Sequence, residues 1–217
     1  MGSTSKSHAE NKAAMRQHIL ESAFKTFSEK TIDAINLTEV AKSAGVGPAT
    51  VYRYFESKTG LVLEVNTWVW NRFIGDNHKR ANLDDQSAAE TYEFFLDSFI
   101  DLYRNHRDIL RFNQFFNVYV HREDVTAEQL QPFNDVIAIP KQRFHDCYEK
   151  GKTDHTLRTD IPEGEIFSKT LHLMLAAVTR YAVGLVYDTG IAPEHELLFL
   201  KDLLMKAYTM PQPAGLT

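Results

Sequence analysis

The hydrophobic and polar positions of this chain follow a helical period almost throughout its 217 residues. Over residues 9–29 the apolar residues recur three and four positions apart, which places them on one side of a helix. No run shows the alternation of apolar and polar residues that marks a half-buried strand, and ten glycines are too few to punctuate many strands. The pattern therefore predicts an all-α protein. The apolar stripe of the first helix consists of Ile19, Leu20, Ala23, Phe24 and Phe27.

Residues 37–55, with the sequence LTEVAKSAGVGPATVYRYF, predict two short helices joined by a tight turn. Thr38 is a candidate cap of the first helix, because its hydroxyl can accept a hydrogen bond from a free backbone amide. Gly45 suits a left-handed turn, and Pro48 suits the first position of the second helix, where proline loses no hydrogen bond. The helix over residues 9–29 would cover this pair and complete a three-helix unit.

The second short helix has an outer face suited to DNA recognition. Val51 and Phe55 are four positions apart and face inward, so the other side is left to polar and small residues. Two helices joined by a short turn with glycine are the geometry that places the second helix in the major groove. A helical hairpin with a merely solvated polar face explains the same pattern about equally well. The outer residues able to contact bases or phosphates are Ala49, Thr50, Tyr52, Arg53 and Tyr54.

A long helix is expected to follow, capped by Ser57 and running from Lys58 to about residue 79. A lysine in the first turn is poorly placed for the helix dipole. A phosphate bound at this helix start would explain it, and a solvated surface lysine is the alternative. The helix is too long to belong only to the three-helix unit, so we expect it to lead into the rest of the chain.

Residues 12–70 carry a family resemblance. The residues that carry it are Arg16, Ile19, Leu20, Ala23, Phe24, Phe27, Thr38, Val40, Ala41, Ala44, Gly45, Val46, Thr50, Val51, Tyr52, Tyr54, Phe55, Ser57, Lys58 and Leu61. Together they resemble the N-terminal signature of TetR-type transcriptional regulators. The resemblance implies a dimeric, all-helical regulator with a DNA-binding head and a variable ligand-binding body.

The resemblance also implies DNA contacts: phosphate contacts from Thr38, Thr50, Tyr52, Tyr54 and Lys58, and a base or backbone contact from Arg53. The chain departs from the family pattern at four places. Lys30-Thr31 stands where glycine commonly closes the first helix, Gly47 replaces a frequent hydroxyl cap, Ala49 replaces a frequent glycine or polar residue, and Gly60 replaces a frequent acid. Base reading is therefore left mainly to Arg53. The predicted DNA-binding set is Thr38, Gly47, Pro48, Ala49, Thr50, Tyr52, Arg53, Tyr54 and Lys58.

Residues 1–11 are expected to form a disordered lead-in. The resemblance implies a DNA-binding domain over residues 12–72 and a ligand-binding and dimerisation domain over residues 82–210. Within the last of these, helices are expected at about 88–104 and 106–121. Pro132 and Pro140 should interrupt the helix between residues 125 and 148. The segment GKTDHTLRTDIP, residues 151–162, is expected to be a polar loop before the final two helices.

The final two helices, about 163–187 and 193–208, are the predicted dimer interface. The middle of the first is apolar on nearly all sides, and such a helix must be covered on all sides. One monomer of this size could cover a single face, so a second copy would cover the other in a four-helix interface about a two-fold axis. The alternative is that this helix lies at the centre of one monomer.

Candidate effector contacts come from aromatic and polar residues of the C-terminal domain. For each residue alone a structural role is the simpler interpretation. His172 and Arg180 are the most suggestive, because polar groups on a mostly buried helix need partners. The candidates are Tyr103, Phe112, Phe116, Tyr119, Cys147, Tyr148, His172, Arg180 and Tyr181.

Charge and composition agree with a regulator that meets DNA at one end. The net charge is −5; residues 1–60 hold eight Lys/Arg against six acids, and the remainder holds sixteen against twenty-three. A single cysteine, Cys147, excludes a disulfide within the chain and fits a reducing cytoplasm. No membrane-spanning run and no apolar signal core are present in the sequence, so we expect a cytoplasmic protein.

Enzymatic patterns are weak. His195-Glu196 lacks the second histidine of a zinc-protease helix, and no glycine-rich phosphate loop or glycine-flanked nucleophilic serine is found. We therefore expect no catalysis, no cofactor and no metal site. The favoured function is a ligand-responsive repressor that binds a palindromic double-stranded DNA operator as a homodimer and is released by a small molecule bound in the C-terminal domain. A helical small-molecule-binding module without DNA binding is the alternative, and an all-helical enzyme is third.

Overall fold

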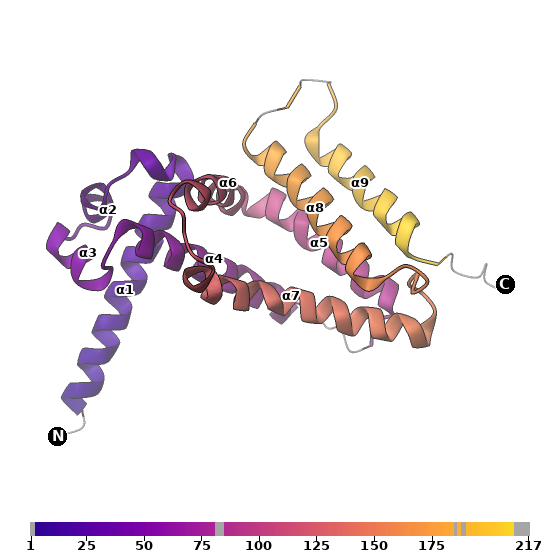
Figure 1. Cartoon of the computed structure of the whole chain (residues 1–217), viewed down its shortest axis with the longest axis horizontal. Coiled ribbons are helices and arrows are strands. Elements are labelled where there is room, and N and C mark those ends of the chain that lie inside the picture. The colour runs from indigo at the N-terminus through magenta and orange to yellow at the C-terminus, as the bar shows by residue number, and fades with distance from the viewer. Residues whose placement is uncertain (1–2, 81–84, 185, 188–189, 211–217) are drawn as a thin grey trace. The chain divides into compact units, whose positions relative to one another are not determined.

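The computed structural model describes residues 3–80, 85–184, 186–187 and 190–210. Every regular element in these ranges is a helix, and the one β contact found there is an isolated bridge between Leu157 and Thr209. The all-α prediction is confirmed. The elements are α1 (Ser3–Glu29), the 3-10 helix η1 (Ile32–Ala34), α2 (Leu37–Ser43), α3 (Pro48–Tyr54), α4 (Lys58–Arg80), α5 (Ala88–Asn105), α6 (Arg107–Arg122), α7 (Ala127–Asp154), α8 (Glu163–Ala182) and α9 (Pro193–Tyr208) (Figure 1).

The chain divides into two compact units. Unit 1 contains residues 1–72 and 111–136, and unit 2 contains residues 73–110 and 137–217. α4, α6 and α7 therefore contribute residues to both. The predicted C-terminal domain, 82–210, included residues 111–136, which the structure groups with the N-terminal helices instead. None of the helices in the described ranges combines the length and the apolar character that crossing a bilayer demands.

α1 is longer than predicted. It begins at Ser3, within the range for which the sequence predicts a disordered lead-in, and residues 1–2 of that range lie outside the described residues. No glycine or proline lies between Ser3 and Glu29, and a helix already formed by the packed part extends at little cost through such a sequence. The predicted apolar stripe is confirmed, because Ile19, Ala23 and Phe27 are fully buried.

Aromatic side chains explain why residues 111–136 belong to unit 1. Phe24 of α1 makes an edge contact with Phe112 of α6, with ring centroids 5.7 Å apart. Phe112 lies 6.0 Å from Phe116, and Phe116 lies 5.9 Å from Phe133 at the start of α7. The Arg111 side chain also donates to the carbonyl of Ser28, at the end of α1, over 3.4 Å. This row of rings joins segments that are far apart in sequence.

α7 is continuous from Ala127 to Asp154, so the predicted interruptions at Pro132 and Pro140 are wrong. Each proline removes one helix hydrogen bond. Pro132 is exposed and lies near the helix N-terminus, where water can reach the carbonyl that loses its partner. Packing along the helix offsets the cost, because four apolar residues of α7 are buried: Val136, Phe144, Cys147 and Tyr148.

α8 and α9 form the C-terminal part of unit 2 and lie side by side, with α5 packed against both (Figure 1). α9 has the predicted limits. α8 ends at Ala182 rather than near residue 187. Gly184 adopts a φ of +77°, a left-handed conformation that closes a helix.

The core of unit 2 is built around Tyr92 of α5. Its side chain is fully buried, and its hydroxyl lies 2.7 Å from the hydroxyl of Thr170 on α8. Its ring makes edge contacts with Phe144 of α7 and Tyr208 of α9, each at 6.2 Å. One side chain therefore touches three other helices, and burial raises the pKa of Tyr92.

Replacing Tyr92 by phenylalanine should destabilise the protein. The change keeps the ring contacts but leaves the fully buried hydroxyl of Thr170 without its partner. An unsatisfied buried hydroxyl costs about 1–3 kcal/mol, so urea unfolding should show a loss of that size. The matched control is Tyr52→Phe, whose side chain is 56% exposed and whose stability should not change. Equal stability of the two variants would contradict a structural role for this hydrogen bond.

Candidate nucleic-acid interface

α2 begins with a reciprocal cap. The side-chain oxygen of Asn36 accepts a hydrogen bond from the amide of Glu39 (3.0 Å), and the Glu39 carboxylate accepts one from the amide of Asn36 (2.9 Å). This capping box occupies the role predicted for Thr38, so that prediction is wrong. Thr38 instead lies exposed in the first turn of α2, where its hydroxyl is available to a partner.

The turn between α2 and α3 has the predicted form. Gly45 adopts a φ of +65°, the left-handed region that glycine enters without steric cost. The amide of Val46 donates to the carbonyl of Ala41 over 3.0 Å, which ties the turn back to α2. Pro48 occupies the first position of α3, as predicted.

α1 holds the C-terminal ends of both short helices. The Arg16 guanidinium donates to the carbonyl of Tyr54, the last residue of α3, over 2.9 Å, and it forms an ion pair with Glu64 of α4. The same group lies 4.7 Å above the ring of Phe55. A ring nitrogen of His18 lies 2.8 Å from the carbonyl of Ala44, at the end of α2. Carbonyls at helix ends lack hydrogen-bond partners within their own helix, and here side chains of α1 supply those partners.

The two sides of α3 differ as the period predicts. Val51 is fully buried and Phe55 is 3% exposed, whereas Tyr52 is 56% exposed. Arg53 is exposed beside it, and its guanidinium carbon lies 5.4 Å from the centre of the Tyr54 ring. The structure therefore brings most of the predicted DNA-binding residues to one exposed region. Gly47, Pro48, Ala49, Tyr52 and Arg53 are exposed, while Thr50 and Tyr54 are half-buried.

Lys58 begins α4, and the cap predicted for this helix is present. The Ser57 hydroxyl accepts a hydrogen bond from the amide of Gly60 over 3.0 Å. The Lys58 ammonium, however, lies 3.4 Å from the carbonyl oxygen of Asp33 and 5.6 Å from the centre of the Tyr119 ring. Burial lowers the pKa of Lys58, with the nearby charge of Asp33 opposing that shift. A phosphate contact would therefore require this side chain to leave its contacts within unit 1.

Three of the candidate effector contacts lie in unit 1. Phe112, Phe116 and Tyr119 are buried, and the first two belong to the row of rings described above. The hydroxyl of Tyr119 lies 3.0 Å from that of Thr59 on α4.

The other six candidates lie in unit 2 and have different surroundings. Tyr103 and Tyr181 make an edge contact at 6.3 Å, and the Tyr181 hydroxyl donates to Glu196. The Cys147 thiol donates to the carbonyl of Ala88 over 3.2 Å, and burial raises its pKa to about 12. The Tyr148 hydroxyl bonds to backbone carbonyls. His172 and Arg180 are exposed, so the expectation that they are buried polar groups is not met in the single chain.

Asn66 of α4 is a polar residue that the sequence analysis missed. Its side chain is fully buried, and neither its oxygen nor its nitrogen has a hydrogen-bond partner among the described residues. It follows Thr59 by seven positions, so both lie on the side of α4 that meets Tyr119 of α6. A lone asparagine in a helical pattern carries no signal of this kind, because burial is decided by tertiary packing.

Comparison with known proteins points to one family. Residues 19–65 match the model described as "Bacterial regulatory proteins, tetR family". An HTH-type transcriptional regulator of Staphylococcus aureus (strain bovine RF122 / ET3-1) is 32% identical over 178 residues, which cover 80% of this chain and 92% of that protein. A second HTH-type transcriptional regulator, from strain USA300, is 25% identical with the same coverage.

Solved structures share the fold. A transcriptional regulator from Saccharomonospora viridis, solved in complex with choline, has a TM-score of 0.71 at 18% identity and covers 92% of this chain and 100% of that chain. The fatty acid degradation regulator FadR from Bacillus halodurans has a TM-score of 0.69 at 16% identity, with 88% and 94% coverage. With the capped helix-turn-helix and the match over residues 19–65, these comparisons show that the chain belongs to the TetR family and is a DNA-binding transcriptional regulator.

Proposed function

We propose that the protein is a dimeric repressor that reads a palindromic operator through α3 and is released from DNA by a small molecule. The observation that supports the DNA-binding part most directly is the exposed face of α3, which α1 holds in place through Arg16 and His18. The DNA-binding set is the one predicted from the sequence, with Arg53 as the main reader of bases. The proposal assigns no catalytic role to the chain and places it in the cytoplasm, where it meets its operator.

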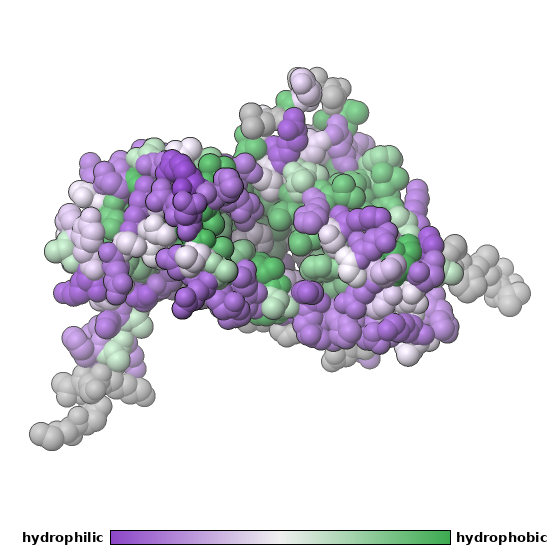
Figure 2. Space-filling view, in the orientation of Figure 1, coloured by the Kyte–Doolittle hydropathy of each residue, from purple (hydrophilic) through white to green (hydrophobic). Residues whose placement is uncertain are grey.

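The proposed dimer interface is the outer side of α8 and α9. Leu173 of α8 is 49% exposed, and Phe199 and Leu203 of α9 are 64% and 46% exposed. Figure 2 shows hydrophobic residues gathered over these two helices. The inner side of the same helices is buried in unit 2, as Met174 and Leu204 illustrate. Exposed apolar surface of this kind marks an interaction site, and two copies would bury it about a two-fold axis.

We further propose that the effector contacts Asn66 in unit 1. A buried carboxamide with neither atom bonded is costly for folding, and a ligand that offers both an acceptor and a donor would satisfy it.

Replacing Asn66 by leucine should stabilise the protein, because leucine has the same branched shape and removes two unpaired buried polar atoms. The expected gain in the free energy of unfolding is about 1–3 kcal/mol in urea titrations. The matched control is Asn36→Ala, which removes a bonded cap and should cost about 0.5–2 kcal/mol. A loss of stability in Asn66→Leu would remove the argument for an effector contact.

Selection of DNA sites from a random pool tests the function as a whole. Two recognition helices related by a two-fold axis read half-sites about 34–36 Å apart, or a multiple of that distance. The expected result is therefore a palindrome whose binding weakens steeply with salt. Enrichment of non-palindromic sites would argue against a dimeric reader.

A further inference from the structure

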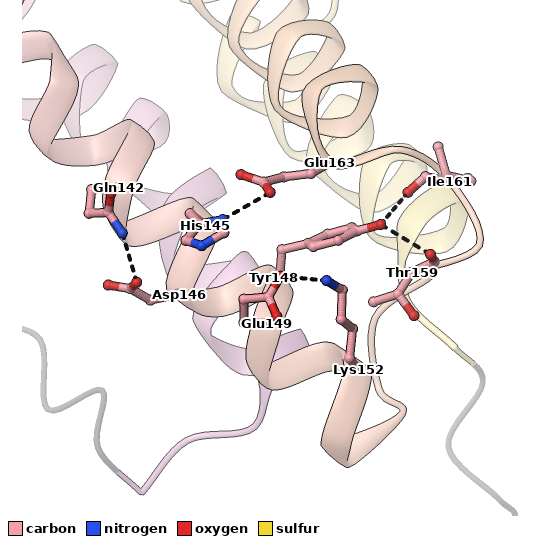
Figure 3. A network of polar contacts seen from close by, with 9 residues as sticks. All are labelled: Gln142, His145, Asp146, Tyr148, Glu149, Lys152, Thr159, Ile161 and Glu163. Atoms are coloured by element: carbon pink, nitrogen blue, oxygen red, sulfur yellow. Dashed lines mark hydrogen bonds and ion pairs between the residues drawn. The ribbon is translucent and has the colours of Figure 1, made fainter.

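Three side chains that could bind a metal ion meet on the surface of unit 2. His145 and Glu149 lie on α7, and Glu163 is the first residue of α8. Their ligand atoms all lie within 4.8 Å of one another, and Nδ1 of His145 is 3.0 Å from a carboxylate oxygen of Glu163 (Figure 3). The residues take no part in the DNA-binding face described above.

Each residue reaches the cluster for a local reason. His145 and Glu149 are four positions apart, so they lie on one side of α7. The hydroxyl of Tyr148 bonds to the carbonyls of Thr159 (3.0 Å) and Ile161 (2.9 Å), and Figure 3 shows its side chain directed from α7 toward this segment. The start of α8 is therefore held beside α7 by contacts that do not involve the His145–Glu163 pair. The three candidate ligands are brought together before any ion binds.

The chemistry of the cluster suits Zn²⁺ or a similar divalent transition-metal ion. One imidazole nitrogen and two carboxylates are ligand types that Zn²⁺ takes at about 2.0–2.2 Å, with water completing the coordination. Ligand atoms around such an ion are about 3–4 Å apart. The side chains of His145 and Glu163 are 45% and 29% exposed, so small rotations can close the remaining distance without disturbing a core.

Two contacts compete with the ion: the hydrogen bond between His145 and Glu163, which occupies two of the candidate ligand atoms, and an ion pair of Glu149. The ammonium of Lys152 lies 2.5 Å from a carboxylate oxygen of Glu149, and both side chains are about half exposed. An exposed ion pair of this kind contributes little to stability, so an ion can displace the lysine. Loss of Lys152 should therefore strengthen metal binding.

We propose that His145, Glu149 and Glu163 form a binding site for a divalent transition-metal ion, with Zn²⁺ as its probe. The bound ion would join α7 to α8 across residues 155–162, next to the helices of the proposed dimer interface. The sequence gives no sign of this site, because Glu163 lies fourteen positions beyond Glu149 and joins it only after folding. The inference is independent of operator binding and of any effector.

Calorimetric titration of the full, untagged chain with Zn²⁺, in millimolar Mg²⁺ and without DNA, tests the proposal. We expect one ion per chain, and more than a tenfold weaker affinity in His145→Ala and in Glu163→Gln. The control His121→Ala changes an exposed histidine of α6 outside the cluster and should bind as the original chain does. All three substitutions are at surface positions, and matching urea midpoints without metal would show that the variants fold.

A second pair of variants tests whether a change in Zn²⁺ affinity arises at this site or from the overall surface charge. Lys152→Ala should bind Zn²⁺ at least threefold more tightly, whereas Lys169→Ala, which frees Glu165 from a similar pair on α8, should leave the affinity unchanged. Unchanged Zn²⁺ affinity in His145→Ala and Glu163→Gln would overturn the proposal, as would equal effects of the two lysine substitutions. Absence of saturable binding to the original chain would overturn it as well.

Discussion

The double substitution Phe199→Glu and Leu203→Glu should convert the protein to a monomer and remove nearly all specific operator binding. The two residues lie one helical turn apart on the exposed side of α9, with 64% and 46% of their surfaces accessible. Placing charges there opposes burial against a second copy, because a charge in an apolar interface loses its hydration without gaining a partner. Sedimentation velocity at micromolar concentration should show a single species of monomer mass.

The expected loss of operator affinity follows because the two DNA-binding heads would no longer be linked in one dimer. When both recognition heads belong to one dimer, the second contact forms at a high effective concentration, and that gain reaches about 10²–10⁴ in affinity. Operator affinity in the double variant should fall by at least about a hundredfold. The control is Val118→Glu, which charges a 55% exposed apolar residue on α6. If the double variant stayed dimeric while the control dissociated, the interface would be on α6 instead.

Replacing Arg53 by alanine should also cause a large loss of operator affinity. Arg53 is exposed on α3, and its guanidinium lies near the ring of Tyr54, which limits its freedom. A bidentate arginine contact with guanine is worth about 1–3 kcal/mol, and a dimer makes it twice. Fluorescence anisotropy with a selected operator should therefore show at least a tenfold loss, together with relaxed preference at one base pair of each half-site.

The loss of operator affinity in Lys58→Ala can be compared with the loss in Arg53→Ala. The Lys58 ammonium contacts the carbonyl of Asp33 and the ring of Tyr119. A phosphate contact by Lys58 would break these contacts, so its net contribution to DNA affinity would be smaller. We expect a smaller loss than for Arg53→Ala, uniform across DNA sequences, with a weaker salt dependence. Lys25→Ala removes one exposed charge from α1 outside the predicted set and should change affinity little. Normal affinity in Arg53→Ala would show that α3 does not read DNA through this residue.

The helix-turn-helix could be predicted in detail because its determinants are local. The period of apolar residues separates the inner and outer sides of α3, and Gly45 and Pro48 act through the backbone conformation of single residues. The error in this region was the cap of α2, where Thr38 and Asn36 are both chemically suitable. The reciprocal bond with Glu39 selects Asn36, which is three positions before it.

Other features depended on contacts between segments far apart in sequence. The prolines of α7 predict a break, yet the buried side of that helix keeps it continuous. The many apolar residues of their helix predict that His172 and Arg180 are buried, but the structure places both on the exposed side. Asn66 is the opposite case: it is a polar residue that is fully buried, because other parts of the chain pack against its side of α4.

The sequence alone determined that the chain is helical, where its recognition helix lies and which side of that helix faces outward, because these properties depend on neighbours within about one or two turns. Only the tertiary structure decided that residues 111–136 join the N-terminal unit and that Arg16 and His18 of α1 support α2 and α3. It also decided that the Lys58 side chain contacts residues of its own unit, and that His145 and Glu163 meet. The physical reason is that side-chain packing and hydrogen bonds between distant segments form only when the core is assembled, and periodicity along the chain contains no measure of them.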